Sequence, residues 1–212
     1  MSLEHTIVHD LLSIGAVFLR PDDPFTWASG IKSPIYCDNR LTLTAPAVRT
    51  HVEEGLVDLI CKHYPTVEVL MGTSTAGIAH GALVANILDL PMAYVRASAK
   101  DHGRNNKIEG RIEKGAKVVV IEDLISTGGS VIEVVNVLRE AGAEVLGIVS
   151  IFTYGMKKGI DRMAEADIEW VSLTNFDEVI AAAAENGYIS EGDISRLKAF
   201  RDDPSDESWI GK

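Results

Sequence analysis

The segment from Val118 to Ser130 constrains the fold of this chain more than any other segment. It opens with the apolar run Val-Val-Val-Ile at 118–121, which is typical of a buried β-strand. The acidic pair Glu122-Asp123 and the small, polar turn Ser-Thr-Gly-Gly-Ser at 126–130 follow, and residues 131–138 then have a helical pattern. Strand, loop and helix in this order predict a turn in which the backbone N–H groups of a helix N-terminus face an anion.

The two halves of this segment suit one kind of ligand. Paired carboxylates beside an anion pocket suit a polyhydroxylated sugar or its metal ion, and a phosphorylated sugar satisfies both halves. The turn is not a Walker loop, because no Gly-Lys-Ser/Thr follows, and it lacks the Gly-x-Gly-x-x-Gly of dinucleotide sites. Glycine-rich turns also follow strands in many α/β proteins that bind nothing there, so that alternative stays open for the turn taken alone.

Composition excludes several classes of protein. The length of 212 residues fits one domain, and 46% hydrophobic with 24% charged residues is a globular composition. A net charge of −11 argues against a nucleic-acid surface. Cys37 and Cys61 have no metal-ligand spacing and indicate idle thiols in a reducing compartment. We find no signal peptide and no apolar run near the roughly 20 residues of a membrane span, so we expect a cytoplasmic protein that binds neither membrane nor nucleic acid.

Apolar runs and helical patterns alternate after Pro65. We expect strands at 67–71, 92–95, 118–121, 145–151 and 170–173, with helices at 78–88, 130–141 and 157–165 between them. This alternation predicts an α/β fold with a mostly parallel central sheet flanked by helices, in which ligands bind beyond the carboxyl ends of the strands.

The two ends of the chain are predicted to add smaller elements to one domain, 1–212. Residues 1–45 carry a helix to about Gly15, short strands at 16–19 and 35–38, and turns at 20–24 and 29–34, and Thr44 is the expected N-cap of a helix reaching about His63. Helices at 176–185 and 189–200 come last. The polar tail 201–212 has the composition of a disordered segment.

Two further loops follow predicted strands. In 71–77, the small residues around Thr73, Ser74 and Thr75 would admit an anion close to the backbone, although a tight turn needs glycine in any case. The second, 96–110, carries five cationic side chains in an acidic protein: Arg96, Lys100, His102, Arg104 and Lys107. It is either a solvated surface loop or a lid that closes over a polyanion.

The whole 118–130 arrangement resembles the phosphoribosyl pyrophosphate signature of type I phosphoribosyltransferases. The resemblance implies that fold, with a small N-terminal hood, and makes Glu122 and Asp123 partners of the ribose hydroxyls. It makes the stretch Leu124, Ile125, Ser126, Thr127, Gly128, Gly129 and Ser130 part of the donor site, with 126–130 cradling the 5-phosphate. It makes Thr73, Ser74 and Thr75 the pyrophosphate loop and implies a non-proline cis peptide near Ser74-Thr75.

Two motifs narrow the resemblance. Lys100-Asp101-His102-Gly103, preceded by Arg96, resembles the flexible catalytic loop of orotate phosphoribosyltransferases. The resemblance implies a homodimer in which loop 96–110 completes the neighbour's site, Arg96, Lys100 and His102 bind pyrophosphate, and Lys100 and His102 act in catalysis with Glu122 and Asp123. The stretch 25–36 resembles that family's Phe-Thr-x-x-Ser-Gly-x-x-Ser-Pro hood over the pyrimidine.

The orotate contacts are expected from Ser126, Lys32 and Tyr36. Plain core packing is the alternative for Trp27 and Tyr36, and an ordinary surface cation is the alternative for Lys32. The chain departs from the family pattern where Ala28, Ala76 and Ala97 replace common lysines, and where 152–155 offers no arginine for the orotate carboxylate.

The resemblance implies magnesium-dependent transfer of phosphoribose to orotate, giving orotidine 5′-monophosphate and pyrophosphate in pyrimidine (UMP) biosynthesis, with Mg²⁺ held mainly by substrate and water. One rival is another type I phosphoribosyltransferase, acting in purine or uracil salvage, which would lack the Lys-Asp-His-Gly lid. The other is a non-catalytic regulator that senses phosphoribosyl pyrophosphate, which the net charge of −11 and the populated lid disfavour.

Overall fold

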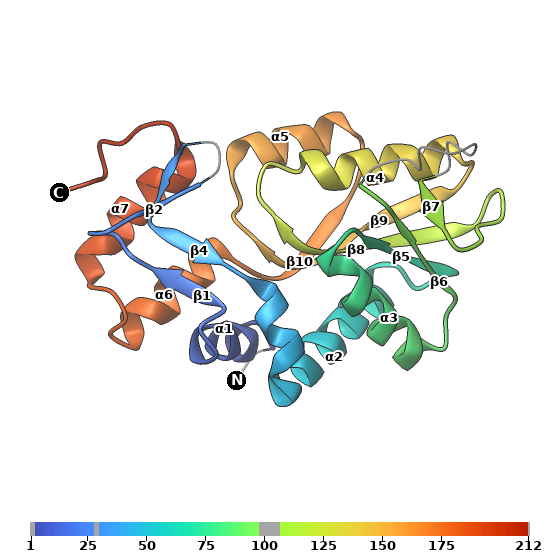
Figure 1. Ribbon diagram of the computed structural model, residues 1–212, viewed down its shortest axis with the longest axis horizontal. Helices are drawn as coiled ribbons and strands as arrows, with labels where there is room; N and C mark the ends of the chain where they lie inside the picture. The colour runs from blue at the N-terminus through green and yellow to red at the C-terminus, as the bar shows by residue number, and fades with distance from the viewer. Residues whose placement is uncertain (1–2, 28–29, 98–106, 212) are drawn as a thin grey trace.

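A computed structural model describes residues 3–27, 30–97 and 107–211. Its main sheet has six strands in the order β10-β9-β8-β5-β6-β7 (Figure 1). The strands are β5 (Val69–Thr73), β6 (Met92–Val95), β7 (Ile108–Glu109), β8 (Lys117–Ile125), β9 (Glu144–Thr153) and β10 (Trp170–Asn175). All pairings are parallel except that of the edge strand β7 with β6. The mostly parallel sheet expected from the sequence is confirmed.

Helices cover both faces of this sheet. In Figure 1, α4 (Gly129–Glu140) and α5 (Lys157–Glu165) lie on one side, and α2 (Pro46–His63) and α3 (Ala76–Leu88) lie on the other. Strand β8 explains why two layers form. Val119 and Ile121 belong to one buried cluster, whereas the alternate residues Val118 and Val120 belong to the other. Successive side chains of a strand point to opposite faces, so a continuous apolar run requires a cover on each face.

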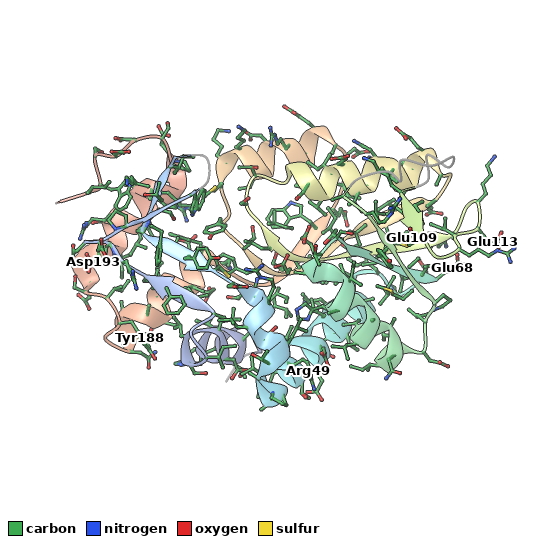
Figure 2. The ribbon with its side chains drawn as sticks, in the orientation of Figure 1. Arg49, Glu68, Glu109, Glu113, Tyr188 and Asp193 are labelled. Atoms are coloured by element: carbon green, nitrogen blue, oxygen red, sulfur yellow. The ribbon has the colours of Figure 1, made fainter. Side chains whose placement is uncertain are left out.

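The N- and C-terminal parts of the chain pack together at one end of the molecule. The N-terminal elements are α1 (Leu3–Ser13), β1 (Val17–Leu19), β2 (Phe25–Thr26), β3 (Lys32–Ser33), β4 (Ile35–Cys37) and the 3₁₀ helix η1 (Asn39–Thr44). Apart from η1, which contacts α2 and β8, they lie beside α6 (Phe176–Glu185) and α7 (Glu191–Asp202), as Figure 1 shows. Trp27 packs edge-on against Tyr154 and Phe200, each with ring centroids 5.8 Å away, so this half-buried side chain packs against the core. In Figure 2, Tyr188 and Asp193 lie at this end, and Glu109 of β7 lies at the other.

Three local predictions in these parts are wrong. Thr44 is not the N-cap of α2: it ends η1, and α2 starts with Pro46 at its first turn after Ala45. The turn expected at 29–34 holds strand β3, which pairs antiparallel with β2. The tail from Arg201 is not a loose segment, because Trp209 is 1% exposed and packs against Phe200 with centroids 5.8 Å apart.

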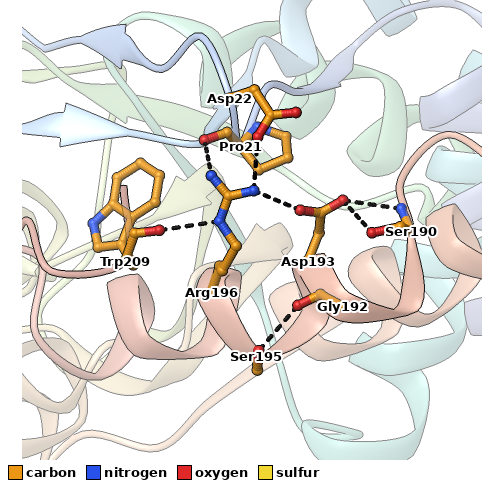
Figure 3. Close-up of polar contacts among 8 residues, drawn as sticks. All are labelled: Pro21, Asp22, Ser190, Gly192, Asp193, Ser195, Arg196 and Trp209. Atoms are coloured by element: carbon orange, nitrogen blue, oxygen red, sulfur yellow. Dashed lines mark hydrogen bonds and ion pairs between the residues drawn. The ribbon is translucent and has the colours of Figure 1, made fainter. Parts of the chain in front are cut away.

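A buried arginine joins the two ends of the chain. Arg196 of α7 donates through Nε to the Trp209 carbonyl (3.0 Å) and through Nη2 to the Pro21 carbonyl (2.7 Å). Its Nη1 contacts both Asp22 and Asp193 at 2.7 Å, as Figure 3 shows. Because a buried charge must be paired to be tolerated, this cluster fixes the N-terminal part against the C-terminal part.

None of the helices described is both long enough and apolar enough to cross a bilayer.

Candidate active site

Glu122 is the buried acid at the centre of the sheet. It lies within β8, not after it, since the strand continues to Ile125, and its side chain is 7% exposed. Its Oε1 accepts hydrogen bonds from Thr73 Oγ1 (2.8 Å) and from the Asp123 backbone N–H (3.0 Å). Burial, together with hydrogen bonding and charge from Asp123, raises the pKa of Glu122 to about 8. This shift favours the protonated form of the carboxyl.

Asp123 is tied to the N-terminal part of the chain. Asn39 Nδ2 donates to the Asp123 carbonyl (2.7 Å), and Cys37 Sγ donates to Asn39 Oδ1 (3.3 Å). The charge of Asp123 also raises the pKa values of Cys37 and Arg40, for which burial and the contact with Asp38, respectively, are the larger causes. Asn39 was not among the residues predicted for the site. Its signal is modest, a polar side chain directly after the strand predicted at 35–38.

A cavity of about 100 Å³ lies between the three predicted loops. It brings together Thr73, Ser74, Arg96, Glu122 and Ser130, all of which the sequence predicts for the donor site. The rest of its lining is Val95, Ala97, Lys107, Glu133, Val134 and Val137. Asp123 is not part of this lining, because neighbouring residues of a strand face opposite ways, although its carboxyl remains close enough to affect Glu122.

The loop after β5 has the backbone that the resemblance implied. The Ser74–Thr75 peptide bond is cis, which confirms that expectation. Ser74 donates twice to the Val95 carbonyl, from N–H (3.2 Å) and from Oγ (2.6 Å), and the Thr73 hydroxyl is engaged by Glu122. Thr75 is exposed at the start of α3 and makes no side-chain cap.

The loop after β8 leads directly into α4. Gly128 takes a left-handed conformation (φ +72°) as the N-cap, and no side chain of the described residues caps this helix, so its first N–H groups can face a ligand. Ser126 and Thr127 are half-buried, and Gly129 and Ser130 are exposed in the first turn. Leu124 and Ile125 pack into the hydrophobic clusters on the two faces of the sheet.

The predicted lid is shorter than 96–110. Ile108 and Glu109 form β7 against β6, and the Arg96 N–H donates to the Lys107 carbonyl (2.8 Å), so both ends of the loop are joined at its base. Arg96 Nε lies 3.1 Å from Glu109 Oε1, and Lys107 pairs with Glu133 of α4. Three of the five cationic residues of this loop, Lys100, His102 and Arg104, lie outside the described residues.

The residues expected to meet the base lie apart from this cavity. Lys32 Nζ donates to Thr26 Oγ1 (2.7 Å) across the β2–β3 hairpin. Tyr36 is 40% exposed and stacks at a tilt against Phe25 with centroids 5.6 Å apart, so it is not a core residue. Ser126 stands at the end of β8. The structure therefore brings five of the predicted donor residues together at the cavity, whose lining includes neither Lys32 nor Tyr36. Tyr36 lies on the side of Asp123 instead, since both act on the pKa of Arg40.

The carboxylates of this site suit a divalent cation that binds together with a substrate. In the part of the chain that the structure describes, no three His, Cys, Asp or Glu side chains converge as a metal site. Glu122 and Asp123 nonetheless supply adjacent hard oxygen atoms, and Mg²⁺ is commonly held by one or two carboxylates together with substrate phosphates and water. The residues present fit that mode of binding.

Comparison with known proteins agrees with this geometry. Residues 45–185 match the model of the phosphoribosyl transferase domain. An orotate phosphoribosyltransferase of Bacillus cereus (strain G9842) is 56% identical over 98% of this chain and 99% of its own length. Among solved structures, orotate phosphoribosyltransferase from Aeropyrum pernix is 26% identical, with a TM-score of 0.75 over 87% of this chain and 99% of that one. The UMP synthase of Leishmania donovani is 26% identical, with a TM-score of 0.79 over 92% of this chain but 41% of that one. The chain belongs to the orotate phosphoribosyltransferase family.

Proposed function

We propose that this protein transfers phosphoribose from 5-phosphoribosyl 1-pyrophosphate to N1 of orotate, forming orotidine 5′-monophosphate and pyrophosphate in pyrimidine biosynthesis. The observation that carries the proposal is the convergence of Ser74, Arg96, Glu122 and Ser130 on one cavity at the carboxyl ends of β5 and β8. The donor carries a diphosphate, a sugar and a terminal phosphate, and these three parts need polar groups from three neighbouring loops. Family membership supports the same reaction.

Each loop has a role in this proposal. The N–H groups and hydroxyls of 126–130 hold the 5-phosphate, and loop 73–75 with Arg96 holds the pyrophosphate. Glu122 and Asp123 bind the ribose hydroxyls. Displacement at C1 passes through an oxocarbenium-like state, which acids beneath the sugar stabilise by electrostatics. Thr73 and Asn39 keep this pair in place from β5 and η1.

Mg²⁺ would be held mainly by the donor and water, with Glu122 and Asp123 as the protein's oxygen groups, and would neutralise the charge of the leaving group. The raised pKa of Glu122 fits this dependence, because a bound cation would favour the charged form of the carboxyl.

Lys100 and His102 are proposed to bind the leaving pyrophosphate, with Lys100 or His102 supplying its proton, within a loop that completes the site of a second subunit in a cytoplasmic homodimer. Lys100→Ala is expected to lower kcat at least about tenfold, roughly 1.4 kcal/mol of barrier, without loss of fold. Steady-state kinetics beside Lys114→Ala, a change at an exposed lysine, provide the check. An unchanged kcat would remove the lid from the mechanism.

The reaction itself is tested by incubating the protein with the donor and Mg²⁺ and supplying orotate, uracil, hypoxanthine or adenine in parallel. Consumption of orotate alone is expected. Preference for another base would make the protein a salvage enzyme, and binding of the donor without turnover of any base would favour the regulator. Gel filtration coupled to light scattering tests the dimer.

A further inference from the structure

Helix α5 packs against the back of the loop at 126–130. A methyl group at Gly159 would lie 2.6 Å from the Ser126 carbonyl oxygen, so a side chain here would displace the loop. One turn later, Arg162 Nη1 donates to the Thr127 carbonyl oxygen (3.2 Å). Met163, which is 1% exposed, also packs against the loop. Its side-chain methyl lies 3.0 Å from the position that a Cβ on Gly128 would occupy. The loop therefore rests on α5 through Gly159, Arg162 and Met163.

This contact determines where the loop's N–H groups point. The peptide bonds here are trans, so the C=O and N–H of each peptide point in opposite directions. With the Ser126 and Thr127 carbonyls turned toward α5, the N–H groups of Thr127 and Gly128 are turned away from it. Among the described residues, neither N–H donates to another group of the protein. Successive N–H groups on one side of a turn form an anion-binding nest.

Arg162 also contributes charge. It is half-buried and forms no ion pair within the described part of the chain, while its neighbour Asp161 is paired with Lys157. A guanidinium that donates to a backbone carbonyl polarises that peptide and strengthens the N–H on its far side. Its own positive charge stays behind the loop, on the side opposite to the N–H groups.

We propose that Arg162, seated by Gly159, is a positioning residue that orients and polarises the Thr127–Gly128 peptide for the 5-phosphate of the sugar. Arg162 acts through the loop without touching the substrate. The proposal rests on the proposed function, of which it explains one part: how a short, glycine-rich loop keeps a fixed shape around a doubly charged phosphate.

The test compares Arg162→Ala and Arg162→Lys with Arg139→Ala. Arg139 is a matched control, because it also donates to backbone carbonyls near α5, those of Ala166 (2.7 Å) and Asp167 (2.8 Å), but from the far end of α4. Arg162→Ala is expected to raise the KM for the donor and the Kd for ribose 5-phosphate about tenfold, the effect of one charge-assisted hydrogen bond, with kcat changed less than about twofold. Arg162→Lys is expected to recover part of the loss, and Arg139→Ala to leave both constants unchanged.

A second variant tests the same contact without removing the cation. Gly159→Ala is expected to shift the KM for the donor in the same direction, because the added methyl pushes on the Ser126 carbonyl. If Arg162→Ala and Gly159→Ala lose thermal stability while the Kd for ribose 5-phosphate stays at the wild-type value, the positioning role is refuted. Calorimetry with ribose 5-phosphate needs no acceptor base, so failure to consume orotate would overturn the proposed reaction and leave this inference standing on the binding result.

Discussion

Two buried titratable residues near the site have pKa values shifted in opposite directions by one cause. Burial disfavours charge, so it raises the pKa of Glu122 and lowers the pKa of His80, whose ring is fully buried in α3. Neither ring nitrogen of His80 has a hydrogen-bond partner among the described residues. Both residues favour the neutral form in the free protein. The two residues therefore make the free energy of unfolding change with pH in opposite directions. To measure the contribution of one of them, that residue must be replaced alone.

Glu122→Gln provides that separation. The unfolded chain carries the carboxyl near its ordinary pKa of 4.5, whereas the folded protein carries it at about 8, so the folded state binds more protons between these values. Wild-type stability from this residue is complete below pH 4.5 and is lost as pH rises toward 8. The neutral glutamine escapes that loss. Urea unfolding at a series of pH values should therefore show Glu122→Gln gaining on wild type from pH 5 to 8 and levelling off above.

Glu54→Gln, at an exposed position of α2, serves as the control and is expected to show no such trend. A stability difference between Glu122→Gln and wild type that stays constant from pH 5 to 9 would mean that the folded carboxyl titrates normally.

At the scale of elements, the geometry of the predicted donor site depends on how closely α3 approaches the sheet. An alanine methyl at Gly77 would lie 2.3 Å from the Ile121 carbonyl oxygen and 2.5 Å from Thr73 Oγ1. At Gly72 it would lie 2.8 Å from the Ile78 Cα. Glycine at both positions lets the helix start against β5 and β8, and this places Thr73 where it can donate to Glu122.

Gly77→Ala is accordingly expected to destabilise the protein by about 1–3 kcal/mol through overpacking and to lower activity by moving Thr73 from Glu122. Gly192→Ala is the comparison, because an added methyl near the start of α7 meets only Ser190 Oγ at 3.7 Å. It should leave the protein as stable as before, or more stable by up to about 1 kcal/mol, since alanine is the better helix former. Urea unfolding measures both, and equal effects would show that α3 can shift without consequence.

The elements also show what local sequence determines. The pattern of apolar residues located the five longer strands of the sheet, because buried strands carry alternating or continuous apolar residues. It ended β8 too early, since Glu122 and Leu124 are held in the strand by pairing with Ser150 and Phe152 of β9. Strand β7, with two residues, is too short for any period. The meeting of the three loops was predictable because parallel strands end at one edge, and the family resemblance supplied the roles proposed for their residues. Asn39 and Arg162 reach these loops only through tertiary packing.

At the scale of the whole molecule, composition gave a wrong prediction for the C-terminal tail, because one buried side chain decides its structure. Residues 202–208 are charged or polar apart from Pro204, which is why the tail was expected to be loose. Trp209 reverses that outcome, because burial of one indole removes a large apolar area from water. Its carbonyl also accepts from Arg196, which holds Pro21 and Asp22 of the N-terminal part (Figure 3). The two ends of the chain therefore stabilise each other.

Trp209→Ala is expected to lower the free energy of unfolding by about 3–5 kcal/mol, the usual effect of emptying a large aromatic site. Tyr188→Ala, at an aromatic residue that is 59% exposed, should change it by less than about 0.5 kcal/mol. Chemical unfolding followed by circular dichroism reports both. A loss below about 1 kcal/mol for Trp209→Ala would mean that the tail is dispensable for the fold.

The two-residue strand β7 has a consequence for how copies of this protein associate. It ends the sheet at that side, and within the part of the chain that the structure describes it offers an approaching chain only Ile108 and Glu109 for ladder pairing. So short an edge is a poor template for joining sheets from separate molecules, which protects against fibrous aggregation. A continuous intermolecular sheet through β7 is therefore disfavoured, and copies that met at this edge would contact each other through side chains.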